Sequence, residues 1–369
     1  MKILTKFAFL ILFIFSLNVS AIWNEQKARW KGKTEQENGV KVIKNPGEPL
    51  YGEITFELEE DLNIGNEDDE NYLFFRLRDI EVDSDGNIYV LDSGNRRLQV
   101  FEKNGKYLRT IGKRGQGPGE FNAPTQLQLD DETGNIFVKD NMRRKIIIFE
   151  KKGKYIDKDI RLVEVLRDFY LDSGGCIWGI FSLPGIDSRS IKKVTFAGKV
   201  EKIFAEIPYH IQRIVTSLTE GMSAFWITHG YEYDALLSKV DSNTFVYGHS
   251  KKYELVAVDK SGKTLFIIRK DESPKKITKT ERDRITNKEI RHIRESGDQI
   301  SDLSLEFPDY NPYFYSIITD DISRIYVRKN PVSRESKANH VYDLFNKEGL
   351  YLYKIHLNYY PDVIKNGYI

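Results

Sequence analysis

A short pattern recurs along this sequence and restricts the folds that the chain can adopt. Each copy has an apolar residue, a polar turn that contains Asp, and a strand of apolar and aromatic residues. The copies are VDSDGNIYV at 82–90, LDDETGNIFV at 129–138, LDSGGCIWG at 171–179, VDSNTFV at 240–246 and TDDISRIYV at 319–327. Asp, Asn and Gly suit tight turns because they tolerate positive φ. The pattern therefore predicts a series of β-hairpins.

A second hairpin follows each of these. Its copies share an apolar strand and a turn with glycine: VFEKNGK at 100–106, IFEKKGK at 148–154, VTFAGKV at 194–200, AVDKSGK at 257–263 and LFNKEGL at 344–350. Gly105 and Gly153 mark a repeat of about 48 residues. Four antiparallel strands repeated at this spacing around an axis form the blades of a β-propeller. In the first blade, strands a to d are expected at 79–83, 87–92, 97–102 and 106–111.

Residues 79–124 resemble a blade of the NHL-repeat family and its connection to the next blade. The similarity covers the DSDG turn, the Asp-Ser-Gly-Asn-Arg turn at 92–96 and the GQGPGEF connector at 115–121. The second blade, to about Ile160, is also similar, with a diverged turn at 140–144, and blades three to five resemble the repeat weakly. The resemblance implies a six-bladed propeller of the kind found in exported bacterial proteins. It also implies binding of proteins or other ligands, but no single activity.

The fold class that we predict is all-β, a six-bladed β-propeller with an incomplete last blade. Five blades begin near Asp79, Thr125, Val165, Asp234 and Tyr313. Propellers often build the last blade from both ends of the chain, which removes an exposed sheet edge.

Residues at both ends of the chain are candidates for the sixth blade. Residues 52–59 are expected to be its outermost strand, and residues 362–369 its strand a, a turn at Asn366-Gly367 and the start of strand b. A full blade needs about twenty more residues, so we expect the C-terminus to be truncated relative to a full family member. Residues 209–233 are the alternative candidates for filling the gap.

The N-terminus has the pattern of a signal peptide. Lys2 and Lys6 form a short positive region before the apolar stretch FAFLILFIF at 7–15. Val19-Ser20-Ala21 fits a cleavage site. The predicted organisation is a signal peptide at 1–21, a linker at 22–48 and the propeller at 49–369. No later stretch is apolar enough to span a bilayer. We therefore expect a soluble secreted or periplasmic protein with no stable membrane insertion after the signal peptide is removed.

Residues 273–306 are rich in charged residues and are expected to form a helical insertion in the propeller. Ser273-Pro274 suits the start of a helix, and isoleucines follow at loosely helical spacing, at 277, 285, 290, 293 and 300. Two interpretations stay open. The insertion is either a solvated helix packed over one face, or a lid or arm that docks a partner.

Charge and motifs limit the function classes. The chain has 56 Lys and Arg against 55 Asp and Glu, a net charge of +1, so no overall field would attract nucleic acid. The Gly-rich segment GKRGQGPG at 112–119 lacks the order of a phosphate-binding loop and is expected to connect two blades. No nucleophile elbow occurs in a strand–turn–helix setting. The catalytic residues, if any, are therefore unknown.

Histidines and recurring aspartates are the two groups of candidate metal ligands. The six histidines do not form a metal-ligand spacing: His210, His229, His249, His292, His340 and His356. Five aspartates recur at one blade position: Asp83, Asp130, Asp172, Asp241 and Asp320. A ring of carboxylates could bind Ca²⁺, but recurrence in every blade favours a role in capping each turn. We expect no metal site and no cofactor, with Ca²⁺ as the alternative.

The remaining candidates favour structural roles. The basic turns Asn95-Arg96-Arg97 and Arg143-Arg144-Lys145 could bind an anion, but ion pairs with neighbouring carboxylates between blades are the favoured interpretation. Cys176, the single cysteine, lies in an apolar strand and is interpreted as a packing residue.

The sequence favours a binding module over an enzyme. The predicted function is an exported propeller that recognises a protein, peptide or glycan in the cell envelope, since loops on a rigid scaffold commonly carry binding. The alternative is a metal-dependent lyase or hydrolase with its site in the central channel. Fold class alone does not decide between them.

Overall fold

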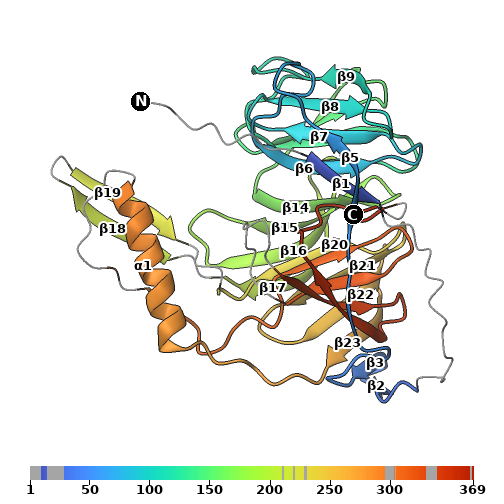
Figure 1. The fold of residues 1–369 in the computed structure, drawn as a ribbon, viewed down its shortest axis with the longest axis vertical. Helices are drawn as coiled ribbons and strands as arrows, with labels where there is room; N and C mark the ends of the chain where they lie inside the picture. Colours follow the sequence, from blue (N-terminus) through green and yellow to red (C-terminus); the bar gives the residue numbers. More distant parts are fainter. Residues whose placement is uncertain are drawn as a thin grey trace.

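The computed structural model describes residues 10–14, 29–209, 212–218, 221–227, 231–295, 303, 305–329, 339–365 and 368–369. Five four-stranded antiparallel units, each in chain order, make up the body of the molecule (Figure 1). Their first strands line a common central channel. The protein is thus an all-β propeller, as predicted, but the described residues form five blades and not six.

The strands follow the repeat closely. The first blade contains β6 (Leu77–Val82), β7 (Ile88–Asp92), β8 (Arg97–Phe101) and β9 (Tyr107–Ile111). The second contains β10 (Pro124–Leu129), β11 (Ile136–Asp140), β12 (Lys145–Phe149) and β13 (Tyr155–Arg161). The third contains β14 (Val165–Leu171), β15 (Cys176–Ser182), β16 (Ser188–Thr195) and β17 (Val200–Pro208).

The last two blades follow the long insertions. The fourth contains β20 (Ala235–Lys239), β21 (Thr244–His249), β22 (Glu254–Asp259) and β23 (Thr264–Lys270). The fifth contains β24 (Ser316–Thr319), β25 (Ile325–Arg328), β26 (His340–Phe345) and β27 (Tyr351–Leu357). In every blade the first strand is innermost, because the hairpins run outward in chain order.

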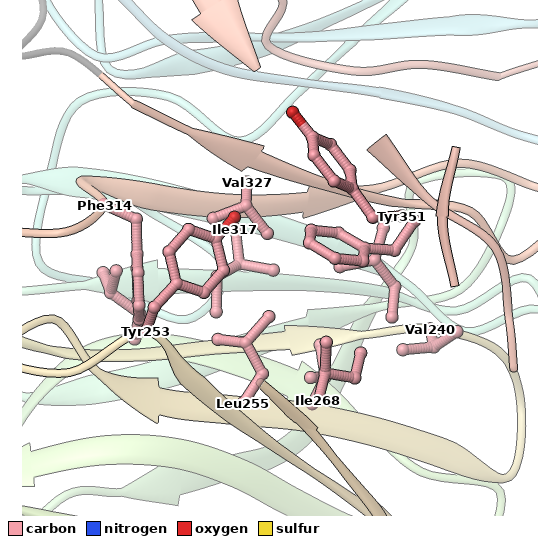
Figure 2. Packing of buried hydrophobic residues seen from close by; sticks show 12 residues of the cluster. Val240, Tyr253, Leu255, Ile268, Phe314, Ile317, Val327 and Tyr351 are labelled. Atoms are coloured by element: carbon pink, nitrogen blue, oxygen red, sulfur yellow. The ribbon is translucent and has the colours of Figure 1, made fainter. Parts of the chain in front are cut away.

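The core lies between neighbouring blades. The second strands β7 and β11 are buried at every position, because both faces of these sheets are covered. Trp178 of the third blade stacks on Phe245 of the fourth, with ring centroids 4.1 Å apart. Figure 2 shows the corresponding core between blades four and five, built from Val240, Tyr253, Leu255, Ile268, Phe314, Ile317, Val327 and Tyr351.

The N-terminal segment adds strands to two blades, which corrects two expectations. β3 (Val40–Asn45) pairs in parallel with β23, and β2 (Lys33–Glu37) pairs with β3, so the segment expected to be a linker extends the fourth blade. β4 (Glu53–Thr55), from the segment expected in blade six, instead pairs in parallel with β27 of the fifth blade. In both cases the added strand covers an open outer edge.

A sixth position exists between blades one and five, but it is not a full blade. A Cβ on Gly153 would lie 2.8 Å from Ile111 of β9, the outermost strand of the preceding blade. A Cβ on Gly105 would likewise lie 2.9 Å from Leu62 of β5 (Glu59–Ile64). β5 therefore takes the place of an outermost strand in front of blade one.

The C-terminal segment takes the innermost place at the same position. Ile364 forms a parallel bridge with Asp320 of blade five, and Lys365 bridges Tyr368, as expected for strand a and a hairpin. The turn expected at Asn366-Gly367 lies outside the described residues, and so do the cleavage site and most of the expected signal peptide. β1 (Leu10–Ile14), within that peptide, pairs with β5.

Two elements lie outside the ring of blades (Figure 1). One is α1 (Lys279–Glu295), inside the predicted insertion. The other is the hairpin of β18 (Gln212–Leu218) and β19 (Gly221–Ile227), which forms a separate two-stranded sheet, so the described part of 209–233 does not complete blade six. Ile285 of α1 packs with Ile277 and Tyr231. Among the described residues, no helix is long and apolar enough to cross a membrane.

Candidate functional site

A cavity of about 470 Å³ occupies the channel at the end where the first two strands of each blade turn. It is lined by the innermost strands of all five blades and by the C-terminal segment. Polar side chains face it from blades one to five, including Asp79, Glu81, Gln126, Gln128, Tyr170, Lys239 and Asp321. Asp362 and Lys365 line it from the sixth position.

Two carboxyl groups of β6 face this cavity. Asp79 accepts hydrogen bonds from the backbone N–H of Leu127, at 2.7 Å, and of Ile80, at 3.0 Å. Glu81 accepts one from the Gln128 amide, at 3.0 Å. Burial, reinforced by the charge of Asp362, raises the pKa of Asp79 to about 7. Burial, together with the charge of Asp79, raises the pKa of Glu81 to about 8.

The next blade contributes amides. The Gln126 side chain donates to the carbonyl of Phe169, at 3.0 Å, and accepts from the N–H of Phe169, at 3.1 Å. Burial raises the pKa of Tyr170 above its ordinary value. At neutral pH, Glu81 is therefore largely protonated and Asp79 partly so, and both lie near the Gln126 amide and the Tyr170 phenol in the lining.

Two lysines also line the cavity. Lys239 pairs with Asp131, with 3.2 Å between Nζ and Oδ2, and Lys365 donates to the carbonyl of Val82, at 2.7 Å. These bonds link blade four to blade two and the C-terminal segment to blade one. The lysines in the cavity therefore have partners within the propeller.

The recurring aspartates hold their own turns. Asp83 accepts from the N–H groups of Asp85 and Asn87, Asp172 from those of Gly174 and Cys176, and Asp320 from those of Ile322 and Arg324. Asp130 and Asp241 each accept from the N–H two residues on. This is the geometry of the turn-capping interpretation.

The basic turns bind backbone oxygens more than carboxylates. Arg143 donates to the carbonyls of Gly117, Glu120 and Gln116, which fixes the Gly-rich connector between blades one and two. Arg97 donates to Asp92 and to the carbonyls of Glu70 and Leu73. Arg97 and Lys145 do pair with carboxylates, but with Asp92 and Asp159 of their own blades, so these ion pairs lie within blades and not between them.

No group of three or more His, Cys, Asp or Glu in the described part of the chain is arranged to hold a metal ion. His210 and His229 lie outside that part. His340 is buried at the start of β26. Cys176 is buried, and burial raises the pKa of its thiol to about 11, which suits a packing residue.

The channel residues were not identified from the sequence. Asp79, Gln126 and Asp168 stand at equivalent places in the first strand, four residues before each turn aspartate, and so do Glu81, Gln128 and Tyr170 two residues later. The sequence did contain a signal for these channel-facing residues. Polar side chains occur at every second position of a strand that should otherwise be buried.

A family model described as "Domain of unknown function (DUF4934)" matches residues 67–250, which span blades one to three and the start of blade four. No curated protein matches the chain. The family match supports a propeller family and does not identify the NHL repeat.

Several solved propeller structures are similar at low identity. A protein described as exported, from Bacteroides fragilis, is 12% identical over 78% of this chain and 72% of its own, with a TM-score of 0.47. A DUF4221 member from Bacteroides vulgatus is 10% identical over 78% and 83%, also with a TM-score of 0.47. A streptogramin B lyase is 11% identical over 78% and 86%, with a TM-score of 0.37. Because these scores are low, the fold rests on the strands described above.

Proposed function

We propose that this protein is an exported binding module that recognises a neutral, hydroxyl-rich ligand, a glycan of the cell envelope, in its central channel. The observation that carries the proposal is the polar lining of the 470 Å³ cavity. That volume lies within the range of small-molecule sites, which use a few convergent polar groups to fix orientation. The blades are taken to be of NHL type, as their sequence pattern suggests.

The chemistry of the lining favours a neutral ligand. Glu81 and Asp79 have pKa values raised to about 8 and 7, so each carries a proton for much of the time near neutral pH. A protonated carboxyl both donates and accepts hydrogen bonds. Together with the Gln126 and Gln128 amides, these groups match sugar hydroxyls, which also do both.

Microcalorimetry with a panel of neutral di- to tetrasaccharides tests the proposal. We expect at least one to bind, and Gln128→Leu to weaken it about tenfold, since one hydrogen bond to a buried polar group is worth about 1–1.5 kcal/mol. Affinity should also fall as pH rises from 6 to 9, because Glu81 and Asp79 lose their protons.

Arg282→Ala is the matched control. It changes α1, in the 273–306 insertion, and tests whether the sugar binds there instead of in the channel. It should leave sugar affinity unchanged. Loss of binding in Arg282→Ala with full binding in Gln128→Leu would move the site from the channel to the arm, and no binding by any sugar would overturn the glycan assignment. The metal-dependent lyase or hydrolase and the bound Ca²⁺ stay predictions, which elemental analysis of the purified protein tests.

A further inference from the structure

Blade five contains a buried arginine that has no counterion within the described part of the chain. Arg328, the last residue of β25, is 4% exposed. Among the described residues, its Nε and Nη1 atoms have no hydrogen-bond partner and it forms no ion pair. Its guanidinium carbon lies 5.0 Å from the centroid of the Tyr360 ring. A cation–π contact of about 1–2 kcal/mol does not offset the several kcal/mol that burying a cation costs.

Other unpaired polar groups lie in the same row. The strand register places Arg328 opposite Tyr342 of β26 and opposite Ser316 of β24. Tyr342 is fully buried, and its hydroxyl has no partner within the described residues. Partners directly opposite in a ladder point to the same side of the sheet, so the Arg328 and Tyr342 side chains lie on one face of blade five.

His340 belongs to the same face. It lies two residues before Tyr342, is 2% exposed, and its Nδ1 also lacks a partner in the described chain. Its ring centroid is 5.8 Å from that of Tyr360. Burial, with the charge of Arg328, lowers the pKa of His340, so the imidazole is neutral near pH 7. Arg328 therefore supplies the one positive charge.

One carboxyl group, that of Asp362, lies in the region of Arg328. Asp362 and Arg328 both act on the pKa of Tyr342, so they lie in the same region, but no ion pair joins them among the described residues. Asp362 is exposed to solvent, whereas Arg328 is buried. A single unpaired cation with hydroxyl and imidazole groups beside it matches a singly charged oxyanion better than a dianion.

We propose that Arg328, Tyr342 and His340 form a binding site for a carboxylate group of a small-molecule ligand. The site lies at the end of β25 and β26, on the face of blade five that packs against the C-terminal segment. It is separate from the channel cavity, whose lining does not include these three residues. A carboxylate bound there would supply the negative charge that Arg328 lacks. It would also accept hydrogen bonds from Arg328, Tyr342 and His340.

Thermal unfolding of the whole protein tests the site, with sodium acetate as the probe and sodium chloride at equal ionic strength as the reference. Acetate at 100 mM should raise the midpoint by about 2 °C or more above chloride, because a ligand of the folded state stabilises it by mass action. Arg328→Met should raise the midpoint in chloride, since it removes an uncompensated buried charge. The same variant should show no response to acetate.

Arg324→Met is the matched control in the same blade. Arg324 already has a carboxylate partner, with 2.5 Å between Nε and Asp320 Oδ2, so its loss should lower the midpoint and leave the acetate response intact. Should Arg328→Met not fold, Tyr342→Phe serves instead and should weaken apparent acetate affinity about fivefold.

Three results would each overturn the proposal. The first is an equal midpoint in acetate and chloride for the unchanged protein. The second is an acetate response that persists in Arg328→Met or, if that variant does not fold, at full strength in Tyr342→Phe. The third is a larger shift in phosphate than in acetate at the same ionic strength, which would assign the site to a different anion.

Discussion

Single polar residues in this propeller divide by their place in the repeat. The aspartate after the first strand accepts N–H groups of its own turn, as Asp83 and Asp320 do, so its charge is offset locally by backbone donors. The residues two and four places earlier face the channel, where Glu81 accepts from the Gln128 amide and Asp79 from backbone N–H groups. The pKa of Asp83 is therefore lowered, whereas that of Asp79, four residues earlier, is raised.

Glu81→Gln should change how stability depends on pH. The pKa of Glu81 is about 8 in the folded protein and 4.5 as its ordinary value, so the unfolded chain loses this proton first. Stability therefore falls as pH rises from about 4.5 to about 8. The variant has no proton to lose at this position, and its amide oxygen can still accept from Gln128.

Urea unfolding at pH 5 and pH 8.5 measures this effect. We expect the variant and the unchanged protein to be similar at pH 5, and the variant to be more stable by about 1–2 kcal/mol at pH 8.5. Parallel pH profiles for the two proteins would show that Glu81 is not held protonated in the channel.

At the scale of elements, the turn between the third and fourth strands fixes the spacing of the blades. Gly153 has φ +91°, and a Cβ there would meet Ile111 of the preceding blade at 2.8 Å. Gly39, in the β2–β3 hairpin, has φ +78° but open space around it. Comparing an alanine substitution at each of the two glycines therefore distinguishes the free-energy cost of positive φ from the cost of a steric contact between blades.

Gly153→Ala should destabilise the protein more than Gly39→Ala. Positive φ costs an alanine about 1–2 kcal/mol at either site, and the contact with Ile111 adds about 1–3 kcal/mol of overpacking at Gly153 alone. Chemical denaturation of both variants gives the difference directly. Equal losses would mean that the blades move apart freely to accept the added methyl group.

The sequence predicted the elements better than it predicted their partners. The strands of blade one were expected within two residues of β6 to β9, because Asp and Gly mark both turns of the repeat. Residues 33–45 and 53–55 were assigned to the wrong places. A hairpin turn in the sequence identifies two antiparallel neighbours, but two parallel strands are not joined by a short turn, so their pairing cannot be predicted in this way. The channel was missed because its polar residues hydrogen-bond across blades, and the sequence shows only that polar residues alternate in the first strand, as Asp79 and Glu81 do.

At the scale of the whole molecule, the ring depends on joining blade five to blade one. Between blades one and two, Asp79 binds the N–H of Leu127, and between blades four and five Thr319 donates to the carbonyl of Lys239. At the sixth position the bonds come from the C-terminal segment, through the Asp320–Ile364 bridge and the Lys365–Val82 hydrogen bond. Val363 packs on the core of blade one and Ile364 on that of blade five.

Removal of residues 362–369 should therefore weaken the closure of the ring more than the loss of one polar contact. Burying Ile364 is worth roughly 1.5–3 kcal/mol, and the partly buried Val363 adds less, so we expect a loss of about 2–4 kcal/mol, measured by urea unfolding. Lys365→Met keeps both apolar contacts and should lose only about 1 kcal/mol. Hydrogen exchange should rise first in β6 and β24, the strands that face the sixth position. The contrary outcome is a truncated chain that unfolds at the same urea concentration with unchanged hydrogen exchange. Blades one and five would then be held together by their own contacts, and the C-terminal segment would not contribute to closure of the ring.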